Sequence, residues 1–294
     1  MLKIFYLGAV LVAGPLYADA VNLESVRSGP TFVQGTTSTA NVQDRIWQVL
    51  GLGRQMQIFQ QEATDEAAAF AAEGMIAGSG EPWAETVARI NQPARLQTLF
   101  RQGMGKVLMR SDLSLLNTAL GFYETGLGRQ LVPLEISARM AMLDDTVSEN
   151  AQDAFRRAAA RNDPRVDQIN RLIEVADLVE PNVTSGLNAS VAFSRGFGEG
   201  GGYDMPLSEG EMLSETWSQQ DQIEADTRDW LQSFLMLAYS SLSDEQLDEY
   251  IAYAASPEGD ALARALFAAY DEVFLQTSYD MGLAAALRLQ GRQL

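Results

Sequence analysis

The feature that most constrains this chain is an internal repeat. The segment FYETGLG at residues 122–128 returns 131 residues later as YAASPEG at residues 253–259. Both copies contain an aromatic residue, a small hydroxyl residue three positions on, and a glycine three positions beyond that. Self-similarity at a long period indicates that one folding unit has been duplicated, so the repeat predicts two consecutive copies of one architecture.

Weaker correspondences extend the repeat on both sides of this motif. Their spacing drifts, as it does when loops between helices of constant length gain or lose residues. The further matches are 44–46 with 167–169 at a spacing of 123, and Trp83 with Trp217 and Phe100 with Phe234 at a spacing of 134. These matches place the first predicted copy at residues 42–158 and the second at residues 159–294.

Composition and periodicity indicate helices in nearly the whole chain. Ala, Leu, Gln, Glu and Arg dominate, and no stretch alternates apolar and polar residues with the period of a strand. Residues typical of helix N-termini recur: the capping boxes Ser208/Glu211 and Ser243/Gln246, and the capping residues Asp163 and Ser256 before proline. We therefore expect an all-α fold of tandem helical bundles or hairpins. The repeated motif should form a tight corner between two helices, with Gly128 and Gly259 permitting a close approach.

The first twenty residues resemble a secretory signal peptide. A positive start at Lys3 precedes an apolar run at residues 4–17, and the small-x-small sequence 18–20 predicts cleavage after Ala20. A membrane anchor is the alternative, but the run has about 14 residues where roughly 20 are needed to span a bilayer. We expect residues 21–41, rich in Ser, Thr and Gly, to form a flexible lead, and the processed chain to make no stable membrane insertion.

Composition excludes much of the chemistry that enzymes use. The chain has no Cys and no His, and Lys106 is the only lysine beyond the predicted signal peptide. Thiolate and Ser-His-Asp catalysis and the commonest transition-metal ligands are therefore absent. The net charge of −18 disfavours nucleic acid and favours a cationic partner. We accordingly expect no catalytic residue, no metal and no other cofactor, and the balance favours a non-enzyme over an enzyme.

Three patterns nevertheless resemble functional sites. The glycines of a G-x-G-x-x-G pattern (Gly196, Gly198, Gly201) follow no predicted strand, so a flexible connector is the preferred interpretation. Two acidic groups lack the spacing of a calcium loop and are explained as acids in first helical turns. A set of aromatic residues fits a core better than a ligand groove between the copies. The acidic groups are Glu209, Glu211 and Glu215, and Asp144, Asp145 and Glu149; the aromatic residues are Trp47, Trp83, Trp217, Trp230, Phe100 and Phe234.

The corner motif, the long helix behind it and the signal peptide together resemble a family of exported bacterial helical proteins, domain of unknown function 2059. The resemblance is strongest over residues 105–155 and 237–290, and Thr125-Gly126 in the first copy replaces the Ser256-Pro257 pair of the second. It implies a helical fold and export to the periplasm of a Gram-negative bacterium. It implies no catalytic residue, because no activity is established for that family.

Two functions remain open at this point. The first is a non-catalytic binding, adaptor or chaperone-like module of the cell envelope, whose partner is a protein or another envelope component, with a cationic one favoured by the charge. The alternative is a carboxylate-dependent hydrolase that acts on glycan or peptidoglycan. That alternative requires two carboxylates about 5–9.5 Å apart in a cleft, at least one of them with a raised pKa.

Overall fold

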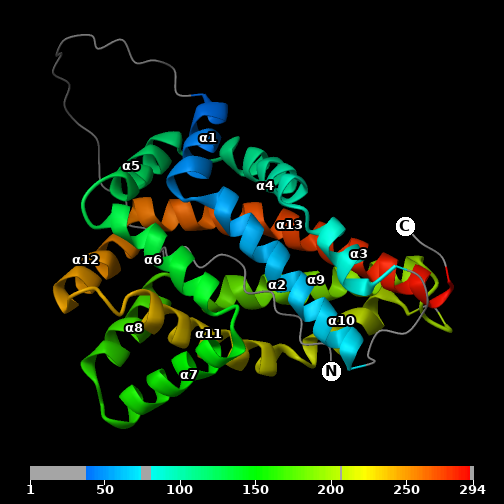
Figure 1. Ribbon diagram of the computed structural model, residues 1–294. Coiled ribbons are helices and arrows are strands. Elements are labelled where there is room, and N and C mark those ends of the chain that lie inside the picture. The colour runs from blue at the N-terminus through cyan, green and yellow to red at the C-terminus, as the bar shows by residue number, and fades with distance from the viewer. Residues whose placement is uncertain (1–37, 74–80, 206, 292–294) are drawn as a thin grey trace.

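The computed structural model describes residues 38–73, 81–205 and 207–291, and these form thirteen helices and no strand (Figure 1). The expected all-α fold is confirmed. The first seven helices are α1 (Thr39–Val49), α2 (Leu52–Ala72), α3 (Trp83–Ile90), α4 (Pro93–Leu108), α5 (Leu113–Glu124), α6 (Gly128–Ala141) and α7 (Asp145–Ala160). The others are α8 (Pro164–Val175), α9 (Val179–Glu199), α10 (Glu209–Trp217), α11 (Gln220–Ala238), α12 (Asp244–Ala254) and α13 (Pro257–Leu289).

Several helices begin where local capping residues predict. Ser208 and Ser243 complete capping boxes on α10 and α12, and Ser256 caps α13 by accepting a hydrogen bond from the Gly259 amide. One predicted boundary is wrong: α1 begins at Thr39, because Ser38 caps it, so the last three residues of the predicted lead are helical. The rest of that lead, like the predicted signal peptide, lies outside the described residues.

The order and lengths of the helices recur along the chain. In both α1–α5 and α8–α12, a helix of 11 or 12 residues precedes one of 21, then one of 8 or 9, one of 16 or 19, and one of 11 or 12. The sixth members differ, since α6 has 14 residues and α13 has 33. The repeat spacing aligns α7 with the C-terminal half of α13. The duplication stays a prediction, and its boundary after residue 158 falls in the last turn of α7.

The two series of helices interlock around one core. The sixth helix of each packs on the fourth helix of the other, α13 on α4 and α6 on α11 (Figure 1). Phe122 of α5 also stacks on Tyr253 of α12, with ring centroids 3.7 Å apart. These two aromatic residues occupy matched positions in the repeated motif. The main apolar cluster contains buried residues from both series, so the predicted copies share a core instead of forming separate domains.

The repeated motif forms the expected tight corner in both series. A Cβ atom on Gly128 would lie 2.3 Å from the carbonyl oxygen of Phe122, and a Cβ atom on Gly259 would lie 2.5 Å from that of Tyr253. Real Cβ atoms do not approach other atoms this closely. The close approach predicted for both glycines is therefore confirmed, and it brings each corner helix directly against the helix that precedes it.

The expected connector at the G-x-G-x-x-G pattern is wrong for its first two glycines. Gly196 and Gly198 belong to α9, and the chain leaves the helix only at the following glycines. A Cβ atom on Gly196 would lie 2.0 Å from the Tyr279 carbonyl oxygen, and one on Gly282 would lie 2.0 Å from that of Phe193. Glycines on α9 and α13 thus let the two backbones meet. Residues 74–80 of the first series, which are also rich in glycine, lie outside the described residues.

Candidate functional site

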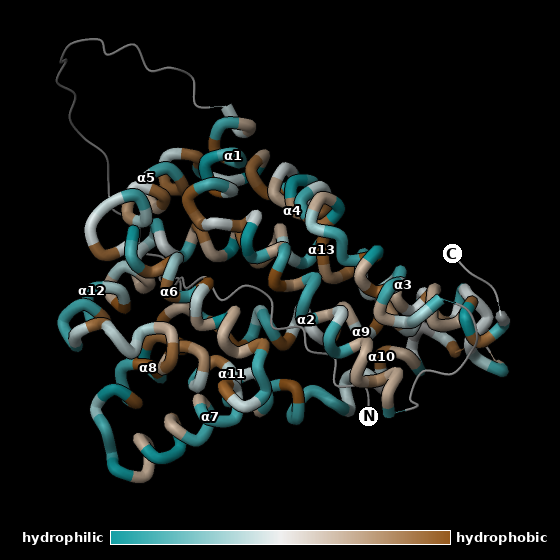
Figure 2. The backbone as a smooth tube through the Cα atoms, in the orientation of Figure 1, coloured by the Kyte–Doolittle hydropathy of each residue, from teal (hydrophilic) through white to brown (hydrophobic). Residues whose placement is uncertain are grey.

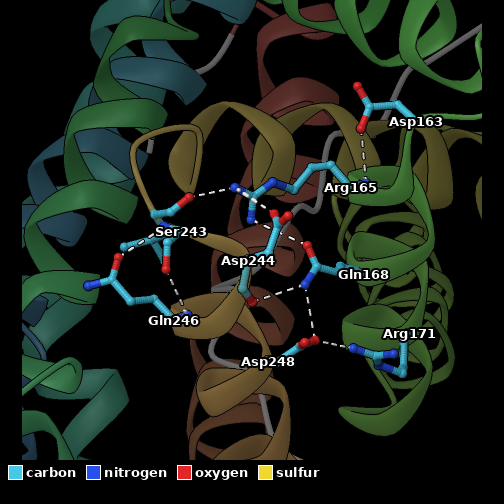
Figure 3. Close-up of polar contacts among 9 residues, drawn as sticks. Asp163, Arg165, Gln168, Arg171, Ser243, Asp244, Gln246 and Asp248 are labelled. Carbon is cyan, nitrogen blue, oxygen red and sulfur yellow. Dashed lines mark hydrogen bonds and ion pairs between the residues drawn. The ribbon is translucent and has the colours of Figure 1, made fainter.

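A polar network joins α8 to the start of α12 (Figure 3). Asp163 caps α8 by accepting a hydrogen bond from the Arg165 amide at 3.0 Å. The Arg165 guanidinium donates to the Leu242 carbonyl oxygen and pairs with the Asp244 carboxylate at 3.4 Å. The arginine therefore ties α8 to the turn that leads into α12, and its positive charge is already engaged within the protein.

The same network continues one turn further along α8. The Gln168 amide donates to the Asp244 carbonyl oxygen and to the Asp248 carboxylate, each at 3.0 Å, and Arg171 pairs with Asp248 (Figure 3). In the first series, Arg45 of α1 bonds the Asn117 side chain of α5 at 2.7 Å. Gln168 and Asp248 occupy the matched positions, so both series use one polar contact to hold their first helix against their fifth.

A groove of about 390 Å³ lies beside this network, between α7, α8 and α11. Alanines of α7 and the side chains of Met236 and Leu237 give it an apolar lining. Asp163 and Asp244 stand at its edge, and the Asp244 side chain is 67% exposed. Arg165 pairs with Asp244 and balances one of the two carboxylates, so the net charge of the lining is negative. The complete lining is Ala151, Ala154, Asp163, Pro164, Arg165, Met236, Leu237, Ser240 and Asp244.

A second, larger groove of about 700 Å³ lies between α4 and α13. Its lining has mixed charge, and its cations are largely paired: Lys106 bonds Glu272 at 2.6 Å, and Arg264 pairs with Asp260. Met109 at its edge is 75% exposed. This lining therefore has no net negative charge, unlike the lining of the groove beside α8.

The chain also contains a buried carboxyl group among tyrosines. Glu135 of α6 is 4% exposed, and its Oε1 atom accepts hydrogen bonds from the hydroxyls of Tyr239 at 2.7 Å and Tyr250 at 3.4 Å. The Tyr250 hydroxyl lies 3.4 Å from that of Tyr123. The Oε2 atom of Glu135 has no hydrogen-bond partner among the described residues. The cluster joins α5, α6, α11 and α12, and so joins both series of helices.

Burial gives Glu135 an unusual affinity for protons. Removal from water raises the pKa of its carboxyl group to about 7, and the two tyrosine hydrogen bonds offset only part of this effect. Burial also raises the pKa of Tyr123, Tyr239 and Tyr250 well above the ordinary value. A carboxyl group with a pKa near 7 has the proton affinity that general acids need. However, Glu135 lines neither groove, and the groups that bond it are tyrosines, so it does not form the carboxylate pair that the hydrolase alternative requires.

Sequence reasoning did not identify Glu135 as a notable residue. A signal was present, because Leu131, Glu135 and Ala138 follow one another at helical spacing and all three are buried. A single acid in an otherwise apolar stripe points inward with its neighbours.

The predicted acidic groups have structural roles where they are described. Glu211 belongs to the capping box of α10, and Asp144 caps α7 by accepting a hydrogen bond from the Thr146 amide at 2.9 Å. The side chains of Glu209 and Glu215 lie outside the described part of the structure. In the described residues, no three carboxylates come together closely enough to hold a metal ion.

The predicted aromatic residues are mostly core residues, with one exception. Trp83, Phe100 and Phe234 are buried, and Trp47 and Trp230 pack against the main cluster. The ring of Trp230 lies 5.4 Å from the Arg139 guanidinium, which Glu62 also pairs at 2.8 Å. Trp217 is 60% exposed, so its expected place in the core is wrong. Figure 2 shows the hydropathy of each residue along the backbone of α10 and the other helices.

Comparison with known proteins identifies no relative: no family model, no curated protein and no solved structure matches the chain. The resemblance to domain of unknown function 2059 therefore stays a prediction. Within the described residues, no helix is both long and apolar enough to cross a membrane.

Proposed function

We propose that this protein is exported to the periplasm of a Gram-negative bacterium and acts there as a non-catalytic binding module of the cell envelope. Support for export comes from the apolar run at residues 4–17 and the small-x-small sequence that follows it. The tandem duplication and membership in domain of unknown function 2059 belong to the same proposal. They are supported by the repeated motif and by the matching order of helices in the two series.

The proposal of a binding function rests on the groove between α7, α8 and α11. It offers an apolar lining to a side chain and, because Asp163 and Asp244 are opposed only by Arg165, a net negative charge to a cationic group beside it. The net charge of −18 attracts cationic partners from a distance. The ligand proposed for this groove is therefore a peptide segment in which Lys or Arg lies next to an apolar residue.

An array of random peptides tests this assignment. We expect bound peptides to be enriched in Lys or Arg beside an apolar residue, with affinity about tenfold lower at 1 M than at 0.1 M salt, since screening shortens the range of charge interactions from about 10 to about 3 Å. Combining Ala154→Trp with Asp244→Lys should fill the groove and reverse the charge at its edge. Both positions are exposed, and Ser243 still caps α12 in this variant.

Ala268→Trp provides the matched control, because Ala268 is an exposed alanine in the other groove. This variant should bind the same peptides with unchanged affinity. Equal loss of binding in both variants, or peptides without a preference for positive charge, would contradict the assignment.

The hydrolase alternative makes the opposite prediction for activity. For a binding module, we expect no turnover of ester, phosphate, peptide or glycan substrates, and background amounts of zinc, iron and manganese in the purified protein. The chain has no His and no Cys, and the described carboxyl group with a raised pKa near 7 lies in the core. A robust hydrolytic activity that Glu135→Gln abolishes in a still folded protein would favour the enzyme.

A further inference from the structure

Two short helices, α3 and α10, are the third helices of their series but have different surroundings. Helix α3 follows α2 and packs on it, and α10 follows α9 and packs on it. Trp83, the first residue of α3, and Trp217, the last residue of α10, match in sequence at the repeat spacing of 134. Trp83 of α3 is 6% exposed, whereas Trp217 of α10 is 60% exposed.

The C-terminal half of α13 accounts for the burial of Trp83. Together with Trp83, Ala284 and Ala285 form a second core cluster, against which Met281 also packs. From the same helix, the Arg288 guanidinium donates a hydrogen bond to the carbonyl oxygen of Glu81, just before α3. Helix α3 is therefore covered by a helical segment that presents small apolar residues to it.

In the described part of the chain, no such segment covers α10. The part of the first series that matches the C-terminal half of α13 in sequence is α7, and α7 does not pack on the described residues of α10. The repeat spacing aligns α7 with the C-terminal half of α13, but the chain turns after α6 and Asp144 caps a new helix. Helix α7 packs on α8 and α11 instead (Figure 1). On α10, Leu213 is 40% exposed and lies one helical turn before the exposed Trp217.

The charge around this apolar pair restricts what it can bind. Residues 204–226 contain no Lys and no Arg. A second copy of this chain, with a net charge of −18, and an anionic lipid surface would both be repelled. A positively charged partner would be attracted. The acids in this stretch are Asp204, Glu209, Glu211, Glu215, Asp221, Glu224 and Asp226.

We propose that Leu213 and Trp217 form a docking face for a helix of another protein. That helix presents small apolar residues, alanine or glycine, to the tryptophan and carries Lys or Arg on its flanks. It covers Trp217 as the C-terminal half of α13 covers Trp83. This face is distinct from the groove between α7, α8 and α11.

A peptide with the sequence of the C-terminal half of α13 is the probe. It comprises residues 275–291 of this chain, with Gln276→Lys and Asp280→Lys to add positive charge. Added to protein purified from cells that express the full chain, it should protect Trp217 from acrylamide quenching and shift its emission to shorter wavelength. The unmodified peptide should bind about tenfold more weakly at low salt, because it lacks the added charges.

Leu213→Asp keeps the fluorescent residue and should weaken binding of the basic peptide about tenfold or more, because the apolar contact is lost. Met109→Asp alters an exposed apolar residue at the end of α4 and should leave binding unchanged. The variant Ala154→Trp with Asp244→Lys should also bind the peptide normally, so failure of the groove assignment and failure of this one are distinguishable.

Results of three kinds would overturn the docking assignment. The first is an unchanged quenching of Trp217 at millimolar peptide, or equal binding by Leu213→Asp. The second is a concentration-dependent dimer in ultracentrifugation that Leu213→Asp disrupts, which would assign the face to a second copy of the chain. The third is binding to anionic lipid vesicles that the same substitution abolishes.

Discussion

Glu135→Gln is expected to stabilise the protein at pH 8 relative to the wild type far more than at pH 5. The ordinary carboxyl pKa of 4.5 applies to the unfolded chain, whereas burial raises the pKa of Glu135 to about 7 in the folded protein. Between these values the folded state holds a proton that the unfolded state has released. The stability contributed by Glu135 is therefore fully present below pH 4.5 and is lost as the pH rises through 7.

Glutamine has the shape of the protonated acid and does not titrate, so the variant lacks this pH dependence. The difference in free energy of unfolding between variant and wild type should change by about 3 kcal/mol across the interval, since each unit of pKa shift corresponds to about 1.4 kcal/mol. Denaturant titrations at pH 4.5, 6 and 8 measure this change.

Glu249→Gln is the matched control, because it makes the same chemical change on the exposed side of α12. Its effect should stay within about 0.5 kcal/mol at each pH. If the free energy of unfolding changes with pH in the same way in the wild type and in Glu135→Gln, the carboxyl group of Glu135 does not titrate as its burial requires.

Gly282→Ala and Gly121→Ala are expected to change stability in opposite directions. Both glycines lie inside helices, where alanine is favoured over glycine by about 0.5–1 kcal/mol. A Cβ atom on Gly121 meets nothing within 4 Å, so this substitution should stabilise the protein by about that amount. A Cβ atom on Gly282 would lie 2.0 Å from a backbone oxygen of α9, and separating the two helices should cost about 1–3 kcal/mol.

Thermal melts of the two variants measure this contrast. The gain in helix propensity is the same in both variants, but only the new Cβ atom at residue 282 would meet a backbone oxygen. Gly196→Ala should resemble Gly282→Ala, since it meets the Tyr279 carbonyl oxygen on the other side of the same helix pair. A Gly282→Ala protein as stable as wild type would mean that α9 and α13 do not pack backbone to backbone.

Local interactions made much of the fold predictable from the sequence. A serine cap needs only the amides of the following turn, so Ser243 and Ser256 indicate helix starts wherever the helices later pack. The corner glycines belong to the same class. Gly128 and Gly259 contact a carbonyl oxygen only six residues earlier, and the repeat marks both positions.

Tertiary packing decided the features that the sequence alone did not. Gly196 of α9 contacts a helix more than eighty residues away, so the glycine pattern was interpreted as a connector. The pKa of Glu135 is raised only when the helices packed around it, α11 and α12 among them, remove its carboxyl group from water. Trp83 and Trp217 match in sequence, yet one is buried and the other exposed. After the second corner the helix continues as α13 and covers Trp83, whereas after the first corner α6 ends and α7 turns away. Burial is therefore set by what packs against a residue and not by the residue itself.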